Sequence, residues 1–288
     1  MNLNSNGKAL AFSKMHGAGN DYVFIDGRDL TLDWTKLAVA VSDRHFGIGS
    51  DGLILALESD RADLRMQMFN ADGSAGRMCG NGIRCLVAFA VDIGLVAAGR
   101  NPVDVETAAG VMEVTPTWSD GRIIRARIDM GEPAFRASEV PFDVPGESTL
   151  EDYPLTVDGF NLAINGVSMG NPHAVAILDE PVGDVELERL GPLVEHDARF
   201  PDRVNLEIVN VISRSLLRVR VWERGSGQTM ACGTGACAAA VVARRKGLIE
   251  DQVTVTLPGG NLGIEWAGTG SVMMDGPVHK VFEGSWPL

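Results

Sequence analysis

The sequence lacks the features of membrane-spanning, disulfide-rich and nucleic-acid-binding proteins. Its apolar stretches, such as Leu86–Val91, are too short to cross a bilayer, and its first 17 residues contain no apolar core of a secretion signal. Four cysteines in 288 residues are too few for a disulfide scaffold. No run of lysine and arginine offsets the net charge of -13, which argues against nucleic-acid and anionic-membrane partners. We therefore expect a folded cytoplasmic protein with free thiols, whose acidity serves solubility.

Signatures of metal and cofactor sites are also missing. No CxxC, HExxH or HxH grouping occurs and the histidines are scattered, so we expect no metal site. Lysines are scarce, and none has a recognisable pyridoxal-phosphate context. The segment Gly47–Gly52, GIGSDG, fits the GxGxxG dinucleotide pattern, but a polar stretch precedes it and a short strand-like run follows it where a long helix is needed. We therefore expect no cofactor.

What the sequence does contain is an internal duplication. The stretch Leu64–Cys79 aligns without a gap to Leu217–Cys232, with an offset of 153 residues. Both copies begin with a strand-like alternation, pass through a Gly-rich turn and reach Cys-Gly-Asn-Gly or Cys-Gly-Thr-Gly. A helix-like segment follows in each copy and ends at Gly94 or Gly247, 15 residues past its cysteine. Two similar units of structure are therefore expected.

The repeat covers nearly the whole chain. Strand-like runs over Val103–Thr107 and Val253–Leu257 follow the helices, and the turn at Gly19–Val23 resembles the turn at Gly170–Ala174. Strand-dominated halves with one long helix each predict an α+β fold. We expect two homologous, pseudo-symmetric domains, each a mostly antiparallel sheet or barrel wrapped around a central helix.

The domain boundary is expected near residue 130. The N-terminal domain then comprises residues 1–130 and 277–288 and carries Cys79, because the last strand, around Val278–Phe282, is expected to return to it. The C-terminal domain comprises residues 131–276 and carries Cys232.

The two duplicated cysteines suggest a catalytic pair. Each is placed by a Gly-rich turn at a helix start, where free N–H groups and the helix dipole stabilise a thiolate. A single cysteine is more often a buried small apolar residue, which is what we expect of Cys85 and Cys237 inside the helices. Equivalent positions in a repeat favour a catalytic role for Cys79 and Cys232 instead.

A thiolate and a thiol on the two faces of one α-carbon would remove a proton and return another, with backbone donors stabilising the transition state. This predicts a cofactor-independent amino-acid epimerase. A module that binds an amino acid without turnover is the non-enzymatic alternative, and it leaves the two thiols without a purpose.

Six motifs, in order and spacing over the whole chain, resemble the diaminopimelate epimerase family, which shares its fold with proline racemases and phenazine-pathway isomerases. The resemblance implies interconversion of LL-2,6-diaminopimelate and meso-diaminopimelate without a cofactor, in lysine and peptidoglycan-precursor biosynthesis. It also implies a small-molecule amino-acid substrate and a homodimer. The motifs are MHGAGNDY (15–22), FNADGS (69–74), MCGNGIRC (78–85), MGNPH (169–173), WERGSG (222–227) and ACGTGACA (231–238).

The same resemblance implies roles for individual residues. Cys79 and Cys232 match the two catalytic cysteines, while His173 and Glu223 match residues that tune the thiols or relay protons. The positions implied to bind substrate are Asn20, Asn70, Gly80, Asn81, Asn171, Asn205, Glu223, Arg224, Gly233 and Thr234.

Two positions depart from the family pattern. Gly52 stands where some members carry a glutamine that contacts the distal end of the substrate, and Gln228 stands where a glutamate is common. From the residues alone, a racemase of proline, hydroxyproline or histidine stays open. Arg224 and the asparagines suit a second zwitterionic head group, which diaminopimelate has and proline lacks.

Overall fold

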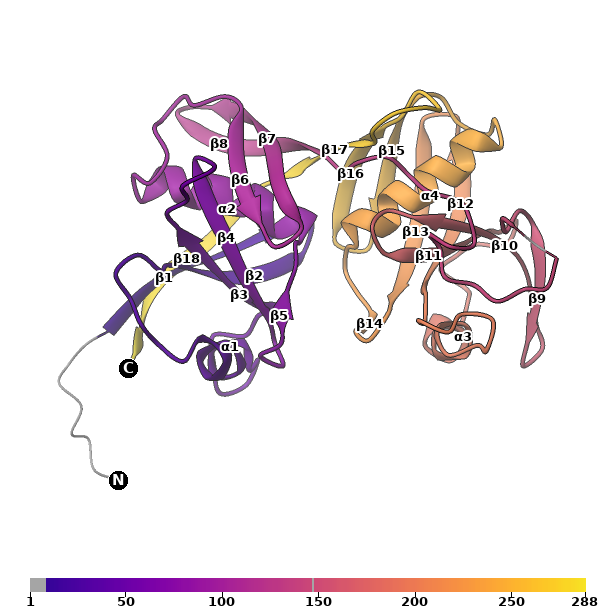
Figure 1. Cartoon of the computed structure of the whole chain (residues 1–288), viewed down its shortest axis with the longest axis horizontal. Coiled ribbons are helices and arrows are strands. Elements are labelled where there is room, and N and C mark those ends of the chain that lie inside the picture. Colours follow the sequence, from indigo (N-terminus) through magenta and orange to yellow (C-terminus); the bar gives the residue numbers. More distant parts are fainter. Residues whose placement is uncertain (1–8, 147) are drawn as a thin grey trace. The chain divides into compact units, whose positions relative to one another are not determined.

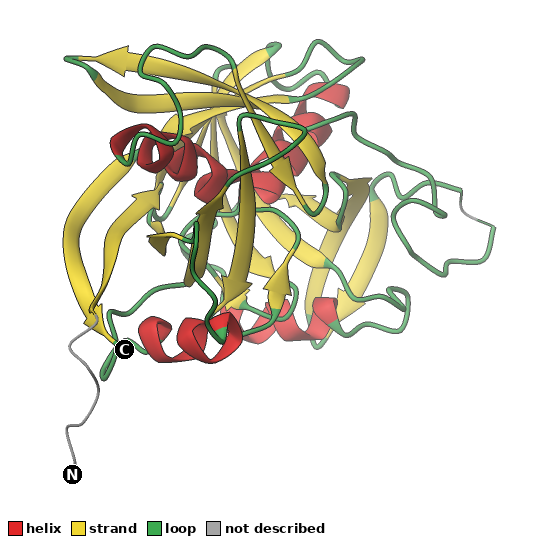
Figure 2. Ribbon diagram, turned by 60° about the vertical axis from the view of Figure 1, so that its left-hand side comes forward, coloured by secondary structure: helices red, strands yellow, loops and turns green. Residues whose placement is uncertain are grey.

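A computed structural model describes residues 9–146 and 148–288 of the chain. The chain folds into two compact units. The first, here called the N-terminal unit, contains residues up to Ile128 together with Gly276–Leu288, and the C-terminal unit contains Asp129–Asp275. In both units strands predominate over helices, as Figure 2 shows with strands in yellow and helices in red.

The N-terminal unit is built on a mixed, mainly antiparallel sheet. Its order is β18-β1-β2-β3-β4-β6-β7-β8, in which β2 and β3 are parallel, β4 and β6 are parallel, and the other neighbours are antiparallel. The elements are β1 (Ala9–Gly17), β2 (Asn20–Asp26), α1 (Trp34–Ser42), β3 (Gly52–Leu57), β4 (Leu64–Asn70), β5 (Ala75–Gly76), α2 (Gly80–Asp92), β6 (Val103–Thr107), β7 (Gly110–Ser119), β8 (Arg122–Asp129) and β18 (His279–Pro287).

The C-terminal unit repeats this arrangement. Its order is β9-β10-β11-β12-β13-β15-β16-β17, with β11 parallel to β12, β13 parallel to β15, and the other neighbours antiparallel. The elements are β9 (Tyr153–Val157), β10 (Phe160–Ser168), β11 (Pro172–Ile177), α3 (Leu187–Glu195), β12 (Asn205–Ser213), β13 (Leu216–Glu223), β14 (Gly227–Gln228), α4 (Gly233–Arg245), β15 (Gln252–Leu257), β16 (Gly260–Glu265) and β17 (Met273–Pro277).

The two sheets therefore have the same strand order and the same directions, which confirms the predicted pseudo-symmetric α+β fold. The C-terminal strand β18 occupies the position in the N-terminal unit that β9 occupies in the other. Figure 1 shows the yellow β18 running beside the indigo β1, with which it pairs from Ala9 opposite Pro287 to His16 opposite His279.

A central helix lies against the sheet in each unit. Helix α2 contacts β1, β2, β3, β4 and β7, and helix α4 contacts the strands from β10 to β13 together with β15 and β16. Both helices are buried along most of their length, because apolar and small residues fill most of their positions. The glycines expected to end them, Gly94 and Gly247, both have φ of 70° and so adopt the left-handed conformation that a helix stop requires.

Each unit also contains a second, shorter helix that the sequence does not reveal. The prediction of one long helix per half is correct for α2 and α4, but it omits α1 and α3, which have nine residues each. Their apolar stretches, such as Leu37–Val41, are too short for the sequence pattern to distinguish a helix from a strand or a loop. Among the described residues, no helix is both long and apolar enough to cross a membrane.

Candidate active site

Cys79 lies at the start of the central helix of the N-terminal unit. Its extended backbone, with φ −136° and ψ 118°, makes it the N-cap of α2, and its Sγ accepts a hydrogen bond from Gly82 N–H at 3.4 Å. Tyr22 O–H donates to the same sulfur at 3.4 Å, and the thiol donates to Asn20 Oδ1 at 3.3 Å. Donors and an acceptor therefore surround this sulfur, which suits a group that alternates between thiolate and thiol.

Tyr22 stays protonated beside this thiol. Burial raises its pKa well above the ordinary value, and the negative charge that Cys79 carries as a thiolate raises it further. The phenol is therefore a permanent hydrogen-bond donor at physiological pH.

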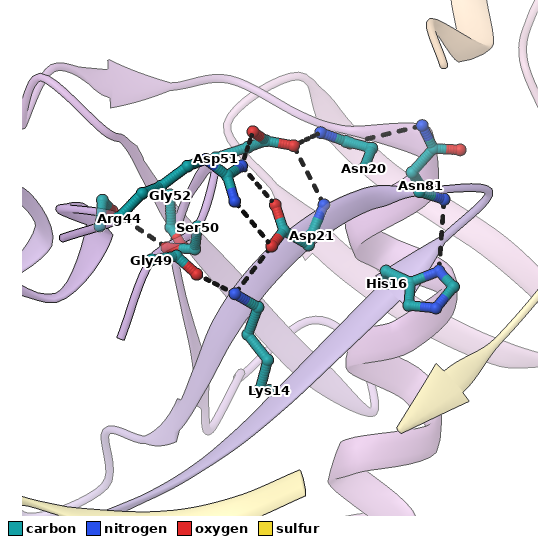
Figure 3. Close-up of polar contacts among 12 residues, drawn as sticks. Lys14, His16, Asn20, Asp21, Arg44, Gly49, Ser50, Asp51, Gly52 and Asn81 are labelled. Atoms are coloured by element: carbon teal, nitrogen blue, oxygen red, sulfur yellow. Dashed lines mark hydrogen bonds and ion pairs between the residues drawn. The ribbon is translucent and has the colours of Figure 1, made fainter. Parts of the chain in front are cut away.

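The amide of Asn20 is held in one orientation by a charged network, shown in Figure 3. Asn20 Nδ2 donates to Asp51 Oδ2 at 2.6 Å, so Oδ1 is the atom directed to Cys79 and, at 3.4 Å, to Asn81 Nδ2. Asp51 is paired with Arg44 at 2.8 Å, and Arg44 also binds Asp21 at 2.9 Å. The GIGSDG segment, whose sequence fits the GxGxxG pattern, thus places Asp51 within hydrogen-bonding distance of Asn20.

The ionisation of the two aspartates follows from these contacts. Burial alone raises the pKa of Asp21, but hydrogen bonds from Arg44 and Lys14 outweigh it and hold the pKa below its ordinary value. Lys14 lies 2.7 Å from Asp21 and also donates to the carbonyl of Gly49. Burial raises the pKa of Asp51, helped by the charge of Asp21.

The first turn of α2 is fixed by a buried arginine. Arg84 is fully buried and donates to Gly80 O at 3.0 Å and to Asn81 Oδ1 at 2.7 Å. The two predicted substrate-binding residues next to Cys79 are therefore held in place by one side chain.

Cys232 occupies the equivalent position in the C-terminal unit. It is the N-cap of α4, and its Sγ accepts from Gly235 N–H at 3.3 Å and lies 3.4 Å from Thr234 Oγ1. Burial raises the pKa of this thiol well above its ordinary value, and the negative charges of Glu223 and Glu207 raise it further. The hydrogen bond from Gly235 N–H at the helix start lowers the pKa of Cys232, but desolvation and the two carboxyl groups outweigh it.

Glu223 closes one side of this cluster at the end of β13. Burial raises the pKa of its carboxyl, while hydrogen bonds with Thr229 and Cys232 oppose that rise. A carboxyl group in contact with the thiol is consistent with the predicted tuning role of Glu223.

His173 and Asn171 connect Cys232 to a carboxyl group deeper in the unit. His173 Nδ1 lies 2.7 Å from Glu207 Oε1, and both side chains are fully buried. The other ring nitrogen, Nε2, lies 3.0 Å from Asn171 Oδ1, and Asn171 Nδ2 donates to Thr234 Oγ1 at 3.3 Å. A continuous line of polar side chains thus runs from Glu207 to the thiol.

Asn205 and Arg224 form a separate pair in the same unit. Asn205 Nδ2 donates to Pro172 O at 2.7 Å, and its Oδ1 accepts from the backbone N–H of Arg224 at 2.8 Å. The guanidinium group of Arg224 is exposed and donates to Asp202 O at 2.8 Å. A positive side chain is thereby anchored at its backbone and open to an anionic ligand.

The remaining expected positions are placed as follows. Asn70 is exposed at the end of β4, and its described hydrogen bonds go to Ser74 and Gly73 in the turn that follows, so it is not joined to the Cys79 cluster by these contacts. A Cβ atom at Gly52 would lie 2.2 Å from Phe69 O, which explains why no larger residue stands there. Gln228 Oε1 accepts from Arg220 at 2.9 Å. The described residues contain no grouping of three or more His, Cys, Asp or Glu side chains arranged for a metal ion.

The residues of these clusters that the sequence prediction omits include Tyr22, Glu207 and Asp51. Tyr22 ends the motif MHGAGNDY and aligns with His173 in the repeat, so the duplication itself contains the signal that could have identified it. Glu207 is an acid within the apolar strand Asn205–Val211, which is unusual because an unpaired charge there is costly. Asp51 lies in the GIGSDG segment, in which no sequence signal indicates a contact with Asn20.

Solved structures of known proteins share this fold. A phenazine biosynthesis protein from Bacillus anthracis has a TM-score of 0.70 at 14% identity, over 98% of this chain and 100% of that one. A hydroxyproline epimerase from Agrobacterium vitis has a TM-score of 0.68 at 15% identity, over 100% of this chain and 94% of that one. At such identities the likeness defines the fold alone, and that fold is the one of the proline racemase-like proteins.

Sequence comparison identifies the family within that fold. The family model described as diaminopimelate epimerase matches residues 12–136 and 166–281. The diaminopimelate epimerase of Acetivibrio thermocellus is 46% identical over 97% of this chain and 99% of its own, and that of Methanococcus maripaludis is 42% identical over 96% and 99%. The chain belongs to the diaminopimelate epimerase family, as the six motifs predicted, and it is therefore an isomerase.

Proposed function

We propose that this protein interconverts LL-2,6-diaminopimelate and meso-diaminopimelate without a cofactor, with Cys79 and Cys232 as the two acid–base groups. The observation that carries the proposal is the duplication of one arrangement. In both units a Gly-rich turn ends in a cysteine that caps the central helix and has a hydrogen-bonding partner for its sulfur. Membership of the family supports the substrate.

In the proposed reaction the two sulfurs act on opposite faces of the substrate α-carbon. One thiolate removes the α-proton, and the resulting carbanion takes a proton from the opposite thiol on its other face, so the configuration inverts. After one turnover the first sulfur is the thiol and the second is the thiolate. Backbone N–H groups at Gly80, Asn81, Gly233 and Thr234 belong to the first turns of α2 and α4, where N–H groups point out of the helix, so they are suited to stabilise the carboxylate of the carbanion.

The two thiols enter the reaction in different states. Burial, together with two nearby carboxyl groups, favours the neutral thiol of Cys232, whereas Cys79 faces donors from Tyr22 and Gly82. We assign Cys79 as the thiolate, and so the base, and Cys232 as the thiol, and so the acid, in the protein before substrate binds. Arg224, with Asn20, Asn70, Asn171 and Asn205, would bind the second zwitterionic head group.

The experiment uses the purified chain in deuterated water. LL-diaminopimelate, proline and histidine are supplied separately, and α-deuteration is followed by NMR or mass spectrometry. We expect deuteration of diaminopimelate alone, and deuteration of proline or histidine instead would overturn the substrate assignment.

The two-base mechanism is tested with single variants. Cys79→Ala and Cys232→Ala should each abolish epimerisation, because each removes the only acid–base group on one face of the α-carbon. The serine variants keep a hydroxyl at the site and should retain slow exchange of one stereoisomer. Full epimerase activity in either alanine variant would disprove the mechanism.

We also propose a homodimer located in the cytoplasm. The strand β18 supports the first, because Val281 and Phe282 on it are apolar and 55% and 46% exposed. All four cysteines are free thiols, which supports a reducing compartment.

A further inference from the structure

The mechanism above gives one fully buried acid, Glu207, no role beyond the effect of its charge on Cys232. Glu207 is fully buried in β12, and its Oε1 contacts His173 Nδ1 at 2.7 Å. Its Oε2 is equally buried and has no hydrogen-bond partner among the residues that the structure describes. Buried polar atoms are nearly always paired, so an acid placed here must serve something that an apolar residue would not.

The position of Glu207 directs it to His173. Strands β11 and β12 are parallel, with His173 opposite Asn205, so Glu207 lies two residues further along β12 on the same face as Asn205. Space for the carboxyl group is left by Gly235, because a Cβ atom there would lie 2.7 Å from Glu207 Oε1. Gly235 belongs to the first turn of α4, where the helix dipole favours negative charge.

The duplication supplies an internal comparison. In the N-terminal unit, Tyr22 lies opposite Gly52 just as His173 lies opposite Asn205, and Ile54 then occupies the position of Glu207. Gly82 leaves the space for Ile54, just as Gly235 does for Glu207. The unit with a phenol beside its thiol therefore has an alkyl side chain behind the ring, and the unit with an imidazole has a carboxyl group. An imidazole has a second nitrogen that needs a partner, whereas a phenol does not.

We propose that Glu207 is a positioning residue for the proposed epimerisation. It accepts a hydrogen bond from the Nδ1–H group of His173 and fixes the ring so that Nε2–H donates to Asn171 Oδ1. Nε2–H is then the group through which His173 exchanges protons with the line of side chains that leads to Cys232. A carboxyl group that orients an imidazole in this way is a recurrent device in catalytic sites. Burial raises the pKa of Glu207, while the charge of His173 opposes the rise. The other titratable groups around it are Cys232 and Glu223.

The test uses Glu207→Gln, which keeps the shape and removes the charge. In a ¹⁵N-labelled protein, long-range proton–nitrogen spectra show which ring nitrogen carries the proton, and His173→Gln identifies the signals of His173. We expect a proton on each ring nitrogen in the unaltered chain, Nδ1–H bound to Glu207 and Nε2–H bound to Asn171 Oδ1, and loss of the Nδ1 proton in the Gln variant. Since partners of this kind contribute about 10- to 100-fold, kcat should fall by that factor while KM changes little.

Two further measurements separate positioning from packing. Glu195→Gln removes another buried carboxyl group of the same unit, one that binds Trp222 Nε1 at 2.7 Å and Gly225 N–H at 2.9 Å, and it should leave the His173 signals unchanged. In the His173→Gln background, Glu207→Gln should cause no further loss of kcat. If the Gln variant does not fold, Glu207→Asp, which withdraws the carboxyl group by one methylene, should likewise weaken the Nδ1–H signal.

Unchanged ring signals in Glu207→Gln, or an equal change in Glu195→Gln, would overturn the inference. Although the inference rests on the proposed function, the ring spectra need no substrate. A chain that failed to deuterate diaminopimelate would therefore disprove the function, while the spectra would still decide whether Glu207 orients His173.

Discussion

At the scale of single residues, the two equivalent cysteines have different surroundings. Tyr22 donates directly to Cys79, whereas Cys232 has Thr234 and two carboxyl groups nearby. The same backbone arrangement thus carries side chains that favour the thiolate in one unit and the neutral thiol in the other. This difference is measurable without substrate, through the reactivity of each thiol.

Replacing Tyr22 with phenylalanine should slow alkylation of Cys79 by iodoacetamide at pH 7.5 by roughly tenfold or more, because hydrogen bonds to charged groups are worth about 1.5–3 kcal/mol. The rate is measured on the Cys79 peptide by mass spectrometry. Tyr153→Phe, in β9 of the other unit, is the matched control and should leave it unchanged. Equal rates in all three proteins would show that the phenol does not stabilise the thiolate.

Replacing Glu223 with glutamine should make Cys232 more reactive. Burial is the larger cause of the raised pKa of this thiol, and the charge of Glu223 is the next, so the variant lowers the pKa without restoring it to the ordinary value. In the Cys79→Ala background, the alkylation rate of Cys232 should begin to rise at a lower pH when Glu223 is replaced. A pH profile that stays in place would contradict the assignment of Cys232 as the acid.

At the scale of elements, a network of charges joins the first strands of the N-terminal unit to the segment before β3. Asp21 at the start of β2 is bound by Lys14 from β1 and by Arg44 from the segment after α1. The side chains of Lys14 and Asp21 are mostly buried, so the pair is worth more than an exposed ion pair.

Asp21→Asn should therefore destabilise the protein by about 3 kcal/mol at pH 7, measured by urea unfolding, because it leaves a buried cation without its partner. The folded pKa of Asp21 is depressed, so its stabilisation is present above the ordinary pKa of an aspartate and is lost as the pH falls through the folded value. The difference between variant and parent should shrink on acidification. The control Asp26→Asn removes a more exposed partner of Arg28 and should cost less than about 1 kcal/mol.

The elements that repeat were the ones that could be predicted. The helix starts at Cys79 and Cys232, the helix stops at Gly94 and Gly247, and the strand at Val103–Thr107 all follow from local signals that occur twice. Contacts between neighbouring strands could not be predicted from such local signals. The Glu207–His173 pair depends on the parallel register of β11 and β12, and sequence separation hides such a contact.

At the scale of the whole molecule, the two sheets share an order that is completed by the last strand of the chain. Strand β18 pairs with β1, so the N-terminal unit is complete only when the end of the chain has been added to its beginning. The same strand carries the exposed Val281 and Phe282.

Phe282→Glu should convert the proposed dimer to a monomer of 30.7 kDa, because a charge in an apolar interface is poorly solvated. Light scattering after gel filtration measures the mass. Ile124→Glu, which alters another exposed apolar residue of the same unit, should leave the dimer intact. A parent chain that is already monomeric would disprove the proposed dimer.

The N-cap positions of Cys79 and Cys232 imply a conflict between the stability of the protein and its activity. Serine, threonine, aspartate and asparagine are the residues that cap helices best, and sulfur is a weak acceptor. The serine variants of both positions should therefore unfold at a higher temperature than the natural chain, by an amount equivalent to roughly 0.5–1 kcal/mol for each helix. Calorimetry of the two variants would measure it. In both units the chain thus keeps a thiol at the N-cap although the helix start is less stable for it.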